Sequence, residues 1–299
     1  MTLSQAIRPA SALTALAMLL AYRYWERPSI RRLVLLGTVC GAGALTRSEL
    51  LLLVPLVVVP LALRTPARPW RERFRRLGAS AFATVFVIAP WSIYNATRFE
   101  HPVLLSAQIG PLLASANCDA TYYGAFQGYF FIPCQRAVND RAGLTDATDE
   151  SQIDVVDRRA ALEYIRKHLD RLPTVERVRL LRIAGLYHPA FYVHADSFID
   201  QRELNVSWAA LYSFYALALL SIAGVIVWWP RRMQFPLAPV VVPIAIVVIT
   251  VLVTYANTRF RTTAEPSLAI LSAVAIDGAI RVGRPARRNE PAARLGNES

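Results

Sequence analysis

The sequence has little lysine, cysteine or histidine. Lys167 is its single lysine, and arginine supplies the other 32 of the 33 basic residues, a bias typical of a GC-rich genome. Three cysteines in 299 residues exclude a disulfide-dense secreted miniprotein, and a hydrophobic content of 55% excludes a disordered chain. The net charge of +12 is scattered between apolar runs, whereas a nucleic-acid-binding protein gathers its charge in one stripe. We therefore expect no nucleic-acid partner.

Long apolar runs are abundant, and the mean hydropathy is +0.34. A membrane-spanning helix needs about 20 mostly apolar residues. One region of double length, 30–63, carries Arg47 and Glu49 in its middle, where each charge would cost about 2.5–3.5 kcal/mol at the centre of a bilayer. Two shorter helices that turn at these charges avoid that cost. The other apolar runs are 10–22, 77–94, 208–229, 237–256 and 267–280.

These runs predict an all-α membrane protein with about seven transmembrane helices. Four lie in residues 1–94 and three in residues 207–280, separated by a large loop, 95–206. Positive charge in short loops marks the cytoplasmic side of a membrane. Seventeen arginines fall in the segments that would share one side, namely 23–32, 64–76, 231–232 and the basic tail 281–299.

This charge distribution predicts the orientation. The tail 281–299 is expected in the cytoplasm, and the N-terminus and the 95–206 loop outside. An outside N-terminus without a signal peptide is uncommon. The chain is therefore either an ordinary protein with an outside N-terminus or one that starts partway through a longer membrane protein.

The 95–206 loop is too long to be a mere connector, and we expect short amphipathic helices in it. A first helix ends at Pro173, with an apolar face formed by Leu162, Ile165, Leu169 and Leu172. A second helix follows from Thr174, with Arg177, Arg179 and Arg182 away from its apolar face; it either lies on the membrane surface or packs against the loop. The acidic stretch 137–157, with Asp154 and Asp157, is predicted to form a surface turn region.

Cys118 and Cys134 are predicted to form a disulfide. Both lie in the loop assigned to the oxidising side of the membrane, 16 residues apart. The alternative is a pair of free buried thiols. Cys40 lies within an apolar run and is expected to pack there.

The ionisable residues with a candidate function lie at the predicted outer ends of the spans. One turn holds Arg47 and Glu49, and another holds Arg259, Arg261 and Glu265. Arginine at this level suits a lipid phosphate, because its planar guanidinium presents several donors to phosphate oxygens. The alternative is interfacial snorkelling. A transporter would carry charges along its spans, where only Asp277 stands, near the inner edge.

No metal site is predicted. His188, His194 and Asp196 are the nearest approach to a ligand set, and their spacing matches no ligand motif.

Several segments resemble the membrane glycosyltransferases of the GT-C fold, most closely the protein-mannosyltransferase-like family 39. The first, ALTRSELLLLVP at 44–55, resembles that family's L-T-R-P-E segment. The second, APWSIYN at 89–95, resembles its P-W-x-x-R-N segment, with Tyr94 in place of the usual arginine. The third, YANTRFRTTAEP at 255–266, resembles its closing R-[FY]-R-x-P-x-E-P segment, and NCDATYYG at 117–124 resembles its actinobacterial branch.

The resemblance implies a sugar donor linked to a polyprenyl phosphate and an extracytoplasmic acceptor, which is a protein, a lipid or a glycan. It makes Arg47, Arg259 and Arg261 the candidates for contacting the donor phosphate. It implies no certain cofactor, leaves the need for a divalent metal open, and places the protein in the plasma membrane of a bacterium. The reaction also needs a carboxylate base. Asp119 is a weak candidate for it, since Glu49 and Glu265 have arginine neighbours that lower their basicity.

In the family, the catalytic aspartate lies in a loop upstream of the region that corresponds to residue 1. The chain is therefore expected to be a fragment, the product of a misplaced start or a degenerate homologue. A non-catalytic membrane scaffold or accessory subunit is the alternative function, and a transporter is the less favoured one.

Overall fold

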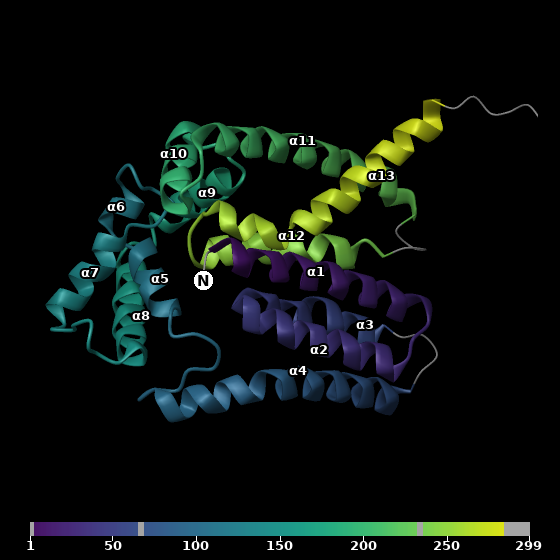
Figure 1. The fold of residues 1–299 in the computed structure, drawn as a ribbon, viewed down its shortest axis with the longest axis horizontal. Coiled ribbons are helices and arrows are strands. Elements are labelled where there is room, and N and C mark those ends of the chain that lie inside the picture. Colours follow the sequence, from purple (N-terminus) through teal and green to yellow (C-terminus); the bar gives the residue numbers. More distant parts are fainter. Residues whose placement is uncertain (1–2, 65–68, 232–235, 284–299) are drawn as a thin grey trace, which may run out of the picture.

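The computed structural model describes residues 3–64, 69–231 and 236–283, and within these ranges it consists of helices and connecting segments with no β-strand. The helices form two groups (Figure 1). Long helices lie side by side in a bundle, and a lobe of shorter helices, α5 to α10, lies at one end of it. The predicted all-helical fold is confirmed.

The first half of the bundle begins with α1 (Leu3–Glu26) and α2 (Ile30–Thr46). The chain then leaves helical geometry at Arg47, which has an extended backbone (φ −149°, ψ 116°). Three short helical pieces follow: η1 (Ser48–Leu52), η2 (Val54–Val58) and α3 (Val59–Leu63). The predicted break of the 30–63 region at its two charges is therefore confirmed, while the part after the break consists of these three pieces and not of one regular helix. Helix α4 (Trp70–Arg98) completes this half.

The second half of the bundle contains α11 (Leu204–Trp228), η3 (Trp229–Arg231), α12 (Ala238–Val253), η4 (Thr258–Thr263) and α13 (Glu265–Gly283). Helix α12 packs beside α1, and α13 crosses α11 (Figure 1). The bundle core is built mainly from α1, α2 and the η1–α3 stretch, with Leu33, Leu36, Leu50 and Val58 almost wholly buried. Of the predicted tail 281–299, residues 284–299 lie outside the described part of the chain.

Two helix pairs in the bundle make close contact through small residues. Between α2 and α4, a Cβ atom at Gly37 would collide with Ser80, and Thr84 Oγ1 donates to the Gly37 carbonyl oxygen at 2.9 Å. Between α11 and α13, a Cβ at Gly224 would collide with the main chain of Leu271, and Ser221 Oγ donates to the Leu268 carbonyl oxygen at 3.0 Å. Close approach through glycine with hydroxyl-to-carbonyl hydrogen bonds is typical of helices that pack within a membrane.

The outer faces of the bundle are apolar. Phe82 and Phe86 of α4 and Leu219 and Ile226 of α11 are each 68–70% exposed. Helices α4 and α11 are long and apolar enough to cross a membrane, judged by length and composition, and two shorter apolar stretches cover 48–63 and 238–253. A water-soluble bundle turns the apolar faces of its helices inward, whereas α4 and α11 carry large apolar side chains on the outside.

The lobe consists of α5 (Ile109–Ala116), α6 (Asp119–Tyr122), α7 (Ile132–Arg141), α8 (Glu150–Lys167), α9 (Leu172–Ile183) and α10 (Pro189–Asp200). It follows the end of α4 and precedes the start of α11, so it lies where α2 and α4 end and α11 begins (Figure 1). The turn before η4 meets the lobe there, because the Ala256 amide donates to the Gly128 carbonyl oxygen at 3.1 Å.

The apolar face predicted for the first loop helix is wrong. Leu162 and Leu169 are exposed, and α8 ends at Lys167 instead of reaching Pro173. Its buried side chains include Asp154 and Asp157, which the sequence placed in a surface turn. The reason is the close contact between α8 and α5, where the Gly110 amide donates to Asp154 Oδ1 at 2.5 Å.

Candidate functional site

The two arginine-containing turns singled out from the sequence meet at the lobe end of the bundle. Arg47 Nη1 donates to the Arg259 carbonyl oxygen at 2.8 Å and to Thr262 Oγ1 at 3.2 Å. Its guanidinium also lies 5.3 Å from the Phe260 ring centroid. The turn after α2 is thereby joined to η4 more than 200 residues later in the chain.

Arg47 also pairs with Glu49 within its own turn, as the sequence predicted. Arg47 Nε lies 2.5 Å from Glu49 Oε1, and both side chains are about 15% exposed. Three of the guanidinium's contacts therefore go to protein atoms. Arg47 acts first as the residue that holds η4 in place.

Within η4, the Asn257 side chain caps the first turn by accepting from the Arg259 amide at 2.9 Å. Arg261 is 9% exposed; its Nε donates to the Ile183 carbonyl oxygen at 2.8 Å, and its guanidinium lies 3.8 Å from the Phe214 ring centroid. Arg261 therefore ties η4 to α9 and α11. Arg259 lies in the same turn and is half-buried.

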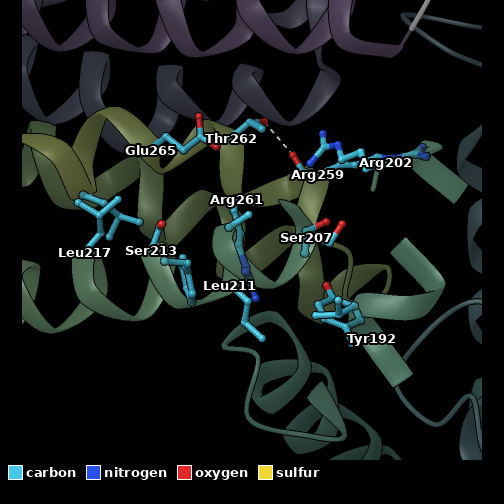
Figure 2. A pocket seen from close by; sticks show the side chains of 15 residues that line it. Tyr192, Arg202, Ser207, Leu211, Ser213, Leu217, Arg259, Arg261, Thr262 and Glu265 are labelled. Atoms are coloured by element: carbon cyan, nitrogen blue, oxygen red, sulfur yellow. Dashed lines mark hydrogen bonds between the residues drawn. The ribbon is translucent and has the colours of Figure 1, made fainter. Parts of the chain in front are cut away.

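A cleft of about 370 Å³ opens between η4, α13 and the start of α11. Its polar side chains are Arg202, Ser207, Ser213, Thr258, Arg259, Arg261, Thr262 and Glu265, and its large apolar side chains are Leu211, Phe214, Leu217 and Leu268. Three arginines and one carboxylate thus border a cavity whose other wall is apolar. Figure 2 shows Arg261 pointing away from Glu265, toward Leu211 of α11.

The cleft combines predicted residues with residues that the sequence analysis missed. Arg259, Arg261 and Glu265 line it, while Arg47 reaches it through Arg259 and Thr262. Arg202 was missed, although it lines the same cleft as Glu265. The signal for it was available, because an arginine just before the apolar run at Trp208 lies at the same level as Arg259.

Asp119, the candidate base, does not line this cleft. It lies on α6 in the lobe, where its Oδ1 accepts a hydrogen bond from the Tyr164 hydroxyl at 2.7 Å. The predicted disulfide between Cys118 and Cys134 is confirmed, with Cα atoms 6.3 Å apart, and it joins the starts of α6 and α7. Asp119 is therefore part of a second cluster, at a distance from the arginine turns.

The structure decides between the two alternatives for the second loop helix. Arg179 and Arg182 of α9 are at most 1% exposed, so this basic face packs against protein and does not lie on a membrane surface. Arg182 donates to the carbonyl oxygens of Gln127 and Ala125, and Arg179 Nη1 donates to the Leu252 carbonyl oxygen at 2.9 Å. Burial lowers the pKa of both guanidinium groups, which keep their charge because the normal value is so high.

Within the described ranges, no group of three or more His, Cys, Asp or Glu side chains could hold a metal ion. His188 adopts a left-handed backbone conformation (φ 45°) as the residue before α10. The side chain of Asp196 lies outside the described residues.

No family model matches the chain, and no curated protein or solved structure matches it either.

Proposed function

We propose that the protein is a multi-pass membrane protein that binds a polyprenyl-phosphate-linked sugar in the cleft beside η4 and takes part in transferring that sugar to an extracytoplasmic acceptor. The observation that carries the proposal is the composition of the cleft. Three arginines lie at its polar side and an apolar wall from α11 and α13 completes it. A lipid with an anionic headgroup needs both surfaces, since its phosphate requires charged donors and its chain requires an apolar wall.

The membrane topology proposed is the predicted one. The seven spans are α1, α2, the η1–α3 stretch, α4, α11, α12 and α13, with the lobe outside, the N-terminus outside and the C-terminus in the cytoplasm of a bacterium. Its support is the packing through small residues, the exposed apolar faces of α4 and α11, and the charge distribution. The helix ends that carry the arginine-rich segments lie opposite the lobe (Figure 1).

Within this topology, a donor phosphate in the cleft is held by Arg259 and Arg202, with Arg261 fixing η4 from behind. In the transfer step the bond between C1 of the sugar and the phosphate oxygen breaks, and a bond from C1 to an acceptor oxygen forms. A carboxylate takes the proton of that acceptor hydroxyl. The sequence favoured Asp119 over Glu265 for this step because arginines neighbour Glu265. Position reverses that preference, since Glu265 is the acidic side chain in the lining of the cleft and Asp119 lies outside it.

A lipid-binding role without catalysis is the second candidate. It is favoured by the contacts of Arg47 and Arg261, whose guanidinium groups are engaged with protein atoms, and by the location of Asp119 outside the cleft. In that role the chain presents the lipid-linked sugar to another subunit.

The test compares two lipids that differ only in the phosphate. Native mass spectrometry of the purified full chain measures binding of undecaprenyl phosphate and of undecaprenol. The phosphate lipid should bind at least tenfold more tightly, and Arg259→Gln or Arg202→Gln should weaken it about ten- to a hundredfold, as expected for loss of a charge-assisted hydrogen bond. Arg159→Gln, an exposed arginine on α8, is the matched control. Equal binding of the two lipids overturns the proposal.

Sugar transfer separates the two candidates. Transfer from a polyprenyl-phosphate sugar by the purified chain, abolished in Glu265→Gln, assigns the chain as the enzyme. Lipid binding with no transfer assigns the non-catalytic role.

Topology has its own test. Asp146→Cys on the lobe and Arg71→Cys at the start of α4 are placed separately in a Cys40→Ala background, in which Cys118 and Cys134 are protected as a disulfide. An impermeant maleimide should label the first cysteine and not the second in intact cells. The opposite labelling contradicts the orientation.

A further inference from the structure

Asp119 belongs to a partly exposed cluster of polar and aromatic side chains on the lobe, formed where α6, the end of α8 and the start of α9 meet. The Tyr164 ring stacks on the His168 ring, with centroids 4.0 Å apart and planes inclined by 20°. His168 also presents its ring to Tyr123 at 6.3 Å, and the Arg171 guanidinium lies 4.6 Å from the Tyr123 centroid. Asp119, Tyr123, Tyr164, His168 and Arg171 are called the aromatic patch below.

The patch offers both ring surface and hydrogen-bonding groups to solvent. Tyr123 is 53% exposed and Asp119 is exposed, whereas Tyr122 below them is fully buried and forms the base. Arg171 is held in place because its Nη2 donates to the Tyr122 carbonyl oxygen at 3.2 Å. Tyr122 therefore holds the exposed side chains of the patch in place from below.

The hydrogen bonds within the patch define what it can offer to a ligand. His168 Nδ1 donates to the Tyr164 carbonyl oxygen at 2.9 Å, because a carbonyl can only accept. In neutral His168, Nε2 is therefore the acceptor. Asp119 Oδ1 accepts from Tyr164, and the other carboxylate oxygen remains as a further acceptor. Arg171 supplies donors of opposite charge.

We infer that the aromatic patch is a binding site for a neutral glycan. The C–H bonds on the face of a sugar ring carry partial positive charge and pack favourably on the negative face of an aromatic ring. Sugar hydroxyls both donate and accept, so they need carboxylate, imidazole and guanidinium groups around such a ring. The patch combines an aromatic ring with these three kinds of polar group. The charges of its one carboxylate and its one guanidinium cancel, which favours an uncharged ligand.

The patch identifies a glycan as the acceptor class for the proposed function. This acceptor role rests on the proposed function, whereas glycan binding by the patch does not. The patch lies on the lobe, away from the arginines that border the cleft.

The experiment uses the full chain in detergent with two neutral hexasaccharides, mannohexaose and maltohexaose, as probes. Saturation-transfer NMR should show binding by the wild type. Tyr123→Leu keeps an apolar side chain but removes the ring, and it should weaken binding about five- to tenfold. Tyr123→Phe should bind within about twofold of wild type. Phe198→Leu, an exposed aromatic residue outside the patch, is the matched control and should leave binding unchanged.

A second variant distinguishes loss of glycan binding from misfolding. Asp119→Asn preserves shape and should weaken hexasaccharide binding severalfold at an unchanged melting temperature. Absence of saturation transfer to both hexasaccharides overturns the inference, as does equal binding by Tyr123→Leu and wild type. Binding of an unglycosylated peptide in place of the hexasaccharides also overturns it. Undecaprenyl phosphate binding by the same sample shows separately whether the proposed function holds.

Discussion

Arg47 donates a hydrogen bond to the main-chain oxygen of Arg259, 212 residues later in the sequence. This contact joins the break after α2 to the 3₁₀ turn before α13. It means that the polar ends of both halves of the bundle form one structural unit.

Replacing Arg47 should therefore affect stability as well as any ligand. Arg47→Gln removes the ion pair with Glu49 and two hydrogen bonds to η4, and we expect it to lower the free energy of unfolding by about 1.5–3 kcal/mol. Thermal unfolding in detergent measures this. Glu49→Gln added to Arg47→Gln should recover part of the loss, because it removes the charge left unpaired. A change below about 0.5 kcal/mol for Arg47→Gln would contradict the assigned role.

The glycine contacts between helices predict a sharp difference between two similar substitutions. Gly224→Ala should destabilise the protein by about 1–3 kcal/mol, because the new methyl group meets the main chain of Leu271. Gly78→Ala on α4 meets no atom within 4 Å and should be neutral or stabilising by up to about 1 kcal/mol. Thermal unfolding of both variants measures the contrast. Similar melting temperatures would show that α11 and α13 do not approach as described.

The buried arginines of α9 predict a second contrast. Arg179→Gln should destabilise the lobe by about 3–5 kcal/mol, since it leaves Glu176 uncompensated and several carbonyl oxygens without their donor. Arg177→Gln, two residues earlier and exposed, should change stability by less than about 0.5 kcal/mol. Hydrogen exchange of lobe amides together with thermal unfolding measures both. Equal effects would place α9 at the surface.

Asp157 predicts a pH dependence of stability. Burial raises the pKa of its carboxyl group to about 6 from an ordinary value of 3.8, although Gln135 donates a hydrogen bond to it. A raised pKa means that the folded state binds the proton more tightly, so this stabilisation is present below about pH 4 and is lost as the pH rises through 6.

Asp157→Asn removes the cost of burying this charge. We expect it to stabilise the protein by about 1–3 kcal/mol at pH 7.5 and to leave stability unchanged near pH 4. Melting temperatures measured from pH 4 to 8 test this, with exposed Asp146→Asn as the control. A stabilisation that is the same at both pH values would exclude ionisation of Asp157 as its cause.

The helices of the bundle and the break at Arg47 could be predicted because each is a local property. An apolar run of suitable length favours a helix, and two charges in the middle of a run favour a turn. The disulfide followed from the spacing of Cys118 and Cys134 in one loop. These features need only the sequence near them.

The buried faces of the lobe helices could not be predicted in this way. Helix α8 buries Asp154 because Gly110, 44 residues earlier, brings a main-chain amide to it. Arg182 is buried because the loop at 125–127 turns its carbonyl oxygens toward α9. Both side chains are buried because main-chain groups far away in the sequence need hydrogen-bond partners. The spacing of hydrophobic residues does not reveal such partners. The cleft was predicted in part: Arg259, Arg261 and Glu265 were identified from the sequence, whereas Arg202 was missed although its place just before the apolar run at Trp208 was a usable signal.

Helix α9 has a mechanical consequence. Arg171, the residue before it, lies on Tyr123 of the aromatic patch, and Ile183, its last residue, accepts the hydrogen bond of Arg261 beside the cleft. Twelve helical residues span about 18 Å. Arg179 and Arg182 fix the second half of the helix by hydrogen bonds to main-chain oxygens of α12 and of the lobe. Helix α9 therefore acts as a rigid spacer between the patch and the cleft. The separation of the patch from the cleft is therefore set by the length of a single helix.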